Sequence, residues 1–379
     1  MRKTYRYRLY PTRSQAEALD GQLGEARRLY NAALQERRDA WRTAGLGLNY
    51  YDQANQLKQI RAEGGLDLAN FSAAQDVLRR VDKTYKAFFR RVKSGKGKAG
   101  FPRFKGRDRF DSYTFPSYGD GVRLLESGKL RVQGVGHIKT KLHRPVEGEI
   151  KTVTLRREAG KWFTCLSVEC EPRPLPASTE AVGMDAGLSV FATLSDGTEI
   201  ENPRYYRESE RKLRIAQRKV ARRKKRSRRR RKAVRELQAA HAHIRNQRSD
   251  FHHKVASRLV VRFGLIAIED LNVKGLAGGM LAKSVHDVGW SAFFGMLAYK
   301  AEGAGRELVR VDPRGTSQTC LCGERVPKDL SQRWHECPAC GLSLQRDHVS
   351  ALLILRLGLS LRAPSSALAG FAREAVCFS

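Results

Sequence analysis

Acidic residues are scarce in this chain of 379 amino acids. There are 39 Asp and Glu against 72 Lys and Arg, which gives a formal net charge of +33. Like charges at this density repel one another in the compact state, and a polyanionic partner relieves that repulsion. Nucleic acid fits such an excess best. A membrane surface fits it less well, because no amphipathic basic helix dominates the sequence.

Long hydrophobic runs are also missing. No stretch approaches the roughly 20 apolar residues needed to span a bilayer. The charged start, Met1–Arg6, has no apolar run behind it, so it is not a signal peptide. No internal repeat stands out. We therefore expect no membrane partner, and the length allows two or three domains.

Four of the seven cysteines crowd between positions 320 and 340. In an intracellular chain such clustering favours a metal over disulfides. Cys337-Pro338-Ala339-Cys340 is half of a zinc knuckle, whereas the other half, Cys320-Leu321-Cys322, is one residue short. We predict structural Zn²⁺ on Cys320, Cys322, Cys337 and Cys340, with His335 as a possible substitute ligand. The alternative is a reduced, metal-free loop.

The N-terminal half begins with a strand at residues 1–10, where Tyr5, Tyr7 and Leu9 alternate with arginines. Helical spacing of apolar residues follows over 12–41, 52–61 and 72–91. After a basic loop at 93–100, short strands are expected over 122–125, 129–132, 137–142, 152–158 and 162–169. They favour a small β-barrel or sandwich, which the first strand can join, leaving the helices as an insertion. A proline-rich linker spans 171–176.

The C-terminal half has a different pattern of apolar and basic residues. Residues 181–194 are typical of a hairpin closed by Ser195-Asp196-Gly197, and a long basic helical region covers 207–263. Residues 265–268 are expected to form a buried apolar strand. Helices are expected over 290–304 and 350–361.

Three carboxylates stand at the ends of these elements. Asp185 and Glu269 each close an apolar strand, and Asp347 precedes the last helix. Chemistry in α/β folds gathers at strand ends and helix starts. Three acids together there would need cations, and two Mg²⁺ or Mn²⁺ ions roughly 4 Å apart would activate water for phosphodiester cleavage. Each acid alone is also a common turn former or helix cap. Spacing does not choose between Glu269 and Asp270, although only one can face the site.

Two basic segments suggest contact with nucleic acid. Residues 222–232 carry ten Lys or Arg and are predicted to form a helix or helical turn along phosphates. A localisation signal or a disordered tail is the alternative. Residues 101–105 mix two phenylalanines with cations, as stacking platforms do. The alternative there is a core edge beside a basic loop.

A series of motifs carries a family resemblance over nearly the whole chain: Arg8–Pro11, Tyr30-Asn31, Gly100–Lys105, Gly183–Gly187, Ile268–Leu271, Gly289-Trp290, Tyr299–Ala301, Thr316–Cys320, Cys337–Gly341 and Arg346-Asp347. In this order they resemble TnpB, the insertion-sequence-encoded ancestor of type V CRISPR effectors.

The resemblance implies an α/β plus β-barrel fold with an RNase H-like RuvC nuclease domain. It implies a wedge-like β-barrel domain (1–10 and 95–176), a helical recognition domain (11–94), the RuvC-like domain (181–314 and 345–379) and a zinc-ribbon-like, target-nucleic-acid-binding insertion (315–344). The catalytic and Mg²⁺-binding (or Mn²⁺-binding) residues would be Asp185, Glu269 and Asp347, which settles Glu269 over Asp270.

The partners implied are a guide RNA derived from the transposon end and double-stranded target DNA, cut beside a short transposon-adjacent motif. The protein would be cytoplasmic and nucleoid-associated, in a bacterium or archaeon.

Two positions near the third acid depart from the family pattern. The family usually has Asp and Asn where this chain has Gln345 and Val349. Two other functions are therefore considered. One is a nuclease-dead or weakly active RNA-guided DNA-binding repressor of the same ancestry. The other is a generic RNA-binding protein with a zinc ribbon, for which the order of the three acids would be accidental.

Overall fold

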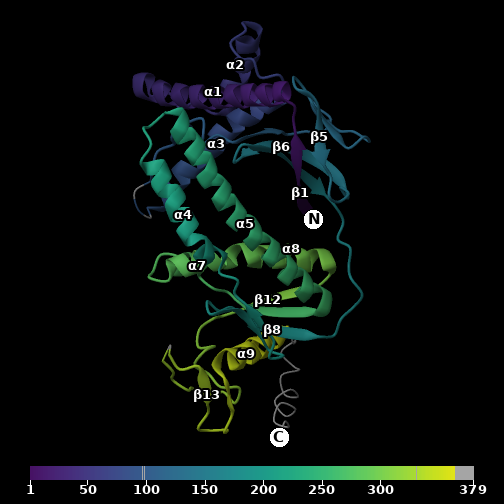
Figure 1. Ribbon diagram of the computed structural model, residues 1–379, viewed down its shortest axis with the longest axis vertical. Coiled ribbons are helices and arrows are strands. Elements are labelled where there is room, and N and C mark those ends of the chain that lie inside the picture. Colours follow the sequence, from purple (N-terminus) through teal and green to yellow (C-terminus); the bar gives the residue numbers. More distant parts are fainter. Residues whose placement is uncertain (96, 98, 330, 363–379) are drawn as a thin grey trace. The chain divides into compact units, whose positions relative to one another are not determined.

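A computed structural model describes residues 1–95, 97, 99–329 and 331–362 of the chain (Figure 1). It divides into two compact units, Met1–Glu171 and the part from Pro172 onward. The end of the expected nuclease domain, residues 363–379, lies outside the described residues. Within the described residues, no helix combines the length and apolar character that crossing a bilayer requires.

The first unit is built on one seven-stranded sheet with the order β2-β6-β7-β1-β5-β4-β3. Its strands are β1 (Arg2–Tyr10), β2 (Ser112–Phe115), β3 (Val122–Leu124), β4 (Lys129–Val132), β5 (Gly136–Lys141), β6 (Glu149–Glu158) and β7 (Lys161–Glu169). All neighbours are antiparallel. Its edge strands β2 and β3 do not pair with each other, so the sheet is a half-barrel where a small β-barrel or sandwich was expected. β1 lies between β7 and β5, as the alternation of its side chains allows.

Three helices share a core with this sheet: α1 (Arg13–Ala44), α2 (Tyr50–Ala62) and α3 (Phe71–Ser94). The predicted alternation is confirmed, because Tyr5, Tyr7 and Leu9 are buried while the residues between them are more exposed. Thr12 begins α1 with a capping box, in which its side chain accepts from the backbone of Gln15. The helices and the sheet therefore fold as one unit.

The second unit contains a five-stranded sheet with the order β10-β9-β8-β11-β12. Its strands are β8 (Ala181–Asp185), β9 (Val190–Leu194), β10 (Glu199–Glu201), β11 (Leu265–Glu269) and β12 (Glu307–Val311). β10, β9 and β8 form an antiparallel meander, and β8, β11 and β12 run parallel. The predicted hairpin after residue 181 is confirmed.

Helices cover both faces of this sheet. The helices of this unit are α4 (Tyr205–Ala221), α5 (Arg228–Arg262), α6 (Val273–Leu276), α7 (Ala282–Val288), α8 (Trp290–Ala304) and α9 (Arg346–Ser360), of which α5, α8 and α9 pack on the sheet. α5 and α8 pack with Ile266 and Ile268 on one face. α9 packs on the other face, where Ile354 meets Leu265 and Ala267.

The basic region expected as one helical stretch over 207–263 is two helices, α4 and α5, which run side by side as a hairpin (Figure 1). The chain leaves helical geometry between Arg222 and Ser227, and the Ser227 hydroxyl caps α5 by accepting from Arg230. Half of the basic run thus lies in a turn and half in the first turns of α5. The small sheet of β13 (Trp334–Glu336) and β14 (Ser343–Gln345) leads into α9.

Candidate functional site

The three predicted carboxylates line one cavity of the second unit. Asp185, Glu269 and Asp347 all border this space of about 790 Å³, together with the cationic side chains of Lys328 and Arg333. Residues far apart in the sequence thus meet at one place.

Strand register brings the first two acids together. β8 and β11 are parallel neighbours, and Met184 lies opposite Ile268. Asp185 and Glu269 follow directly and end their strands. Since Met184 and Ile268 face α5 and α8, alternation turns both acids toward the α9 face.

α9 brings the third acid to the same face. It begins at Arg346, earlier than the expected start at Ser350, so Asp347 lies in its first turn rather than before it. A close approach of helix and strand makes this possible. A Cβ atom on Gly183 would lie 2.1 Å from the carbonyl oxygen of Ala351. Glycine in the motif before Asp185 therefore lets α9 rest directly on β8.

The site concentrates negative charge. Burial raises the pKa of Asp185 to about 8, and the charges of Glu269 and Asp347 act in the same direction. Burial also raises the pKa of Glu269, against a hydrogen bond from Thr316 that lowers it. Carboxylates whose negative charges raise the pKa of a buried neighbour such as Asp185 are the donor set that divalent Mg²⁺ or Mn²⁺ neutralises. In this respect the three acids fit such ions.

Two guanidinium groups lie against the third acid. Arg346 donates from Nε to Oδ1 of Asp347 at 3.0 Å, and Nη1 of Arg333 lies 3.8 Å from Oδ2. Lys328 lines the same cavity. Cations beside acids are what a phosphate group entering this space would meet. Sequence reasoning did not single out Lys328 or Arg333, because no pattern marks them among many basic residues.

Asp270 does not face the cavity. Its carboxylate is exposed and pairs with Arg310 at 3.0 Å. Glu269, one residue earlier, is 8% exposed and lines the cavity. Of the two acids that the sequence left open, only Glu269 borders the site.

The two positions that depart from the family pattern, Gln345 and Val349, both lie outside the cavity lining. Gln345 ends β14 and makes no side-chain cap for α9. Val349 is buried and lies outside the cavity lining. Neither position adds a carboxylate or amide to the site.

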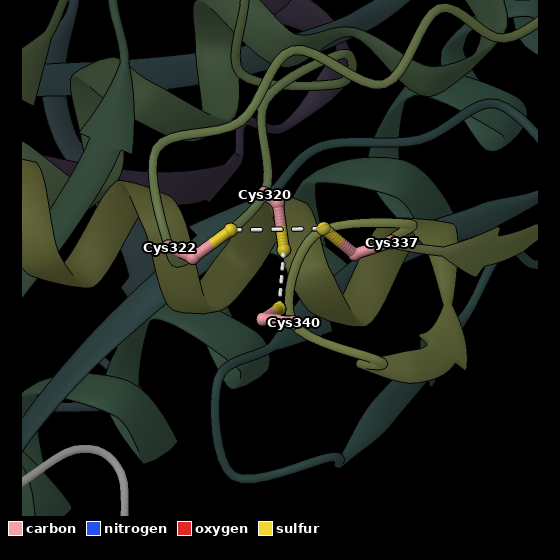
Figure 2. A group of neighbouring side chains, drawn as sticks. All are labelled: Cys320, Cys322, Cys337 and Cys340. Carbon is pink, nitrogen blue, oxygen red and sulfur yellow. Dashed lines mark hydrogen bonds between the residues drawn. The ribbon is translucent and has the colours of Figure 1, made fainter.

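Four sulfur atoms form a second cluster, drawn in Figure 2. The Sγ atoms of Cys320 and Cys340 are 3.6 Å apart, as are those of Cys322 and Cys337, and all four lie within 4.8 Å of one another. The short spacing of Cys320 and Cys322 therefore does not keep either sulfur out. All four are free of disulfides.

The chemistry of this cluster suits zinc. Burial would raise the pKa of Cys337, but hydrogen bonds with the backbone of Cys340 and Ala339 and with neighbouring thiols together lower it to about 7, whereas burial raises the pKa of Cys320. Four thiols gathered with such donors match a tetrahedral structural site. In the described part of the chain no other set of His, Cys, Asp or Glu gathers its ligand atoms this closely. The three carboxylates of the cavity are thus more widely spread than the four sulfurs.

His335 is not a member of the cluster. Its side chain is buried, and its Nδ1 accepts from Nζ of Lys328. The four sulfurs are thus grouped without His335, whose Nδ1 is engaged by Lys328 and whose buried Nε2 has no hydrogen-bond partner among the described residues.

Comparison with known proteins places the chain among mobile-element proteins. A family model described as "Probable transposase" matches residues 165–279, the Cas12f1-like TNB domain matches 290–354, and a helix-turn-helix domain matches 1–45. In this chain residues 1–45 contain β1 and one uninterrupted helix, α1.

Three relatives are similar over much of their length. A "Putative RNA-guided DNA endonuclease" of Streptomyces pristinaespiralis is 35% identical over 96% of this chain and 91% of its own. "Putative RNA-guided DNA endonuclease InsQ" of Escherichia coli (strain K12) is 30% identical over 94% of this chain and 92% of its own. The CRISPR-associated endodeoxyribonuclease Cas12f1 of Sulfoacidibacillus thermotolerans is 27% identical over 58% of this chain and 56% of its own.

Proposed function

The chain belongs to the TnpB family, and from this we propose that it is an RNA-guided DNA endonuclease. It would cut target DNA beside a short transposon-adjacent motif by metal-dependent phosphodiester hydrolysis. The observation that carries the proposal is the meeting of Asp185, Glu269 and Asp347 around one cavity that also holds Lys and Arg side chains.

The topology of the second unit supports an RNase H-like RuvC assignment. Three strands form an antiparallel meander, and the first of them continues into a parallel group in the order β10-β9-β8-β11-β12. Asp185 and Glu269 stand at the carboxyl ends of two parallel strands, where active sites of α/β sheets form, and Asp347 joins them from α9. In this proposal residues 315–344 are the target-nucleic-acid-binding insertion.

Within this proposal the carboxylates of Asp185, Glu269 and Asp347 hold Mg²⁺ or Mn²⁺. When bound, these ions would activate water and stabilise the leaving oxygen. The protein's own cations have a separate part. Arg333 and Arg346 would bind and neutralise a phosphate group of the substrate. Both now pair with Asp347, so each would give up part of that ion pair when the substrate binds.

Charge supports an RNA partner as well as DNA. A net charge of +33 is large for a chain of this length, and both a guide RNA and its duplex with the target would be bound. The exposed basic turn between α4 and α5 suits phosphate contact without base reading. We propose a guide RNA copied from the transposon end.

A nuclease-dead or weakly active repressor is the second candidate. It is favoured by Gln345 and Val349, which supply neither of the polar side chains usual in the family. A cleavage assay separates the two functions. RNA that copurifies with the protein is sequenced first, and a matched RNA is then supplied with Mg²⁺ and duplex DNA.

The test uses Asp185→Ala, Glu269→Ala and Asp347→Ala, with Asp270→Ala as the matched control. Each of the first three should reduce cleavage by about 1,000-fold or more, because metal chemistry supplies several kcal/mol. RNA and DNA binding should persist, and the control should cut normally. Undiminished cutting by any of the three variants would refute its assignment, and a wild-type protein that binds without cutting would establish the repressor.

A further inference from the structure

Thr316 joins the carboxylate cavity to the cysteine cluster. It lies on the loop after β12, four residues before Cys320, and is 3% exposed. Its hydroxyl donates to Oε1 of Glu269 and also lies 3.0 Å from the carbonyl oxygen of Pro313. A hydroxyl has one proton, and a charged carboxylate is the stronger acceptor. The contact with Glu269 therefore dominates.

This contact fixes the carboxylate of Glu269. Within the described residues, Thr316 is the one group recorded as donating a hydrogen bond to that carboxylate. With Oε1 held, the rotation of the group is restricted, and Oε2 is left for the cavity. A partner that orients a metal-binding carboxylate in this way tunes the affinity of the site without touching the ion.

The loop that carries Thr316 is itself held. Gly315 adopts φ +82°, and its carbonyl accepts from the backbone of Gln318 and from the hydroxyl of Thr319, both at 2.9 Å. Ser350 of α9 donates to the carbonyl oxygen of Thr316 at 3.4 Å. This tight turn leads directly into Cys320.

α9 also holds the cysteine loop. Arg356 donates from Nη1 to the carbonyl oxygen of Leu321, between Cys320 and Cys322. The helix that carries Asp347 therefore contacts the loop at both ends of the segment from Thr316 to Cys322. Movement of the cysteines would be transmitted to Thr316 over a short, hydrogen-bonded path.

We propose that Thr316 is a positioning residue of the nuclease site, through which the cysteine cluster sets the metal affinity of Glu269. The inference rests on the proposed function, since it assumes metal at the three acids. It predicts that a change at Thr316 and a change at the cysteine cluster weaken the same metal site by the same route.

The experiment measures Mn²⁺ binding to the zinc-loaded, full-length protein by electron paramagnetic resonance of free Mn²⁺. Asp185→Asn provides the background of nonspecific binding. Thr316→Val should lower Mn²⁺ affinity about 10-fold, the lower end of the effect of such orienting partners. Thr316→Ser keeps the hydroxyl and should bind as the wild type does.

Thr319→Val is the matched control, because that hydroxyl lies in the same turn but bonds only a backbone carbonyl. It should leave Mn²⁺ affinity unchanged. Cys322→Ser should lower the affinity, and the double variant with Thr316→Val should be no weaker than the worse single variant.

Wild-type affinity in Thr316→Val would overturn the inference and leave the proposed function standing. An equal loss in Thr319→Val would also overturn it, since general damage to the loop would then explain the result. Additive losses in the double variant would remove the link to the cysteines. If the wild type binds no more Mn²⁺ than Asp185→Asn does, the proposed metal site fails and this inference fails with it.

Discussion

Asp185 and Glu269 end two neighbouring parallel strands on the same face of one sheet. Burial, and then the negative charge of Glu269, raise the pKa of Asp185 to about 8. Without metal, ionisation of Asp185 opposes folding, and with metal the same charge becomes useful. The pair therefore lowers the stability of the metal-free protein and raises its affinity for a divalent cation, as functional sites often do.

The first prediction concerns stability and pH. Asp185 has a folded-state pKa above its ordinary value near 3.8, so between about pH 4 and pH 8 the folded protein retains a proton that the unfolded chain has lost. Its contribution to stability thus falls as pH rises through this window. Asp185→Asn removes the effect. In magnesium-free buffer that retains zinc, we expect the variant to melt a few degrees higher at pH 8 and equally at pH 4.

Thermal melting across this pH range checks the prediction. Asp270→Asn is the control, because that carboxylate is exposed and outside the cavity. Added Mg²⁺ should raise the melting temperature of the wild type at pH 8 but not that of Asp185→Asn. Identical pH profiles for the wild type and Asp185→Asn would contradict the raised pKa of Asp185.

The second prediction concerns zinc. All four sulfurs lie within 4.8 Å of one another despite the short first pair, so we expect one zinc ion per chain. Cys322→Ser should lose that ion and lower the melting temperature, because structural zinc contributes directly to folding. Elemental analysis of the purified protein measures the content. Cys165→Ser, in β7, should retain zinc, and full zinc content in Cys322→Ser would rule out the four-cysteine site.

Regular, locally determined elements were predictable from the sequence. β1 shows its buried alternation in Tyr5, Tyr7 and Leu9, and α1 and α3 have their apolar residues at helical spacing. Two short strands were not predicted, β2 and β12. They have four and five residues, too few for a clear pattern, and pairing with their neighbours defines them.

The break between α4 and α5 shows a different limit. The residues from Arg222 to Arg226 are all basic and contain no glycine or proline, so the sequence has no strong breaker there. The chain turns all the same, and Arg226 adopts φ +66°. Only Ser227 gave a local signal, as a helix cap. Phosphate contact by this segment stays a prediction from its charge density, which does not predict the turn.

In the candidate site, strand ends predicted Asp185 but left Glu269 and Asp270 open, and the family resemblance chose Glu269. From the residues alone that choice needs the direction of alternation, which depends on which sheet face meets α9. Thr316 lies 47 residues from Glu269, and no sequence period connects them. Such positioning contacts arise from tertiary structure alone.

The third prediction concerns the aromatic residues expected as a stacking platform. Phe101 and Phe104 are 45% and 44% exposed, while the ring of Phe101 packs edge-on against Tyr85 at 5.9 Å. Asn31 of α1 fixes this loop, because its amide both donates to and accepts from the backbone of Lys105. Both rings are thus partly exposed next to cationic residues in the sequence, which suits contact with unpaired bases.

Phe101→Ala and Phe104→Ala should each weaken binding of unpaired RNA, such as oligouridylate, about 5- to 10-fold, since stacking contributes roughly 1–3 kcal/mol per base. Their salt dependence should match that of the wild type, because no phosphate contact is lost. Arg103→Ala should instead reduce the salt slope by about 1. Fluorescence anisotropy over a salt series measures both quantities.

Tyr51→Ala, an exposed aromatic on α2, is the control and should bind normally. If the phenylalanine variants bind as tightly as the wild type, these rings are the edge of the core and not a platform for bases.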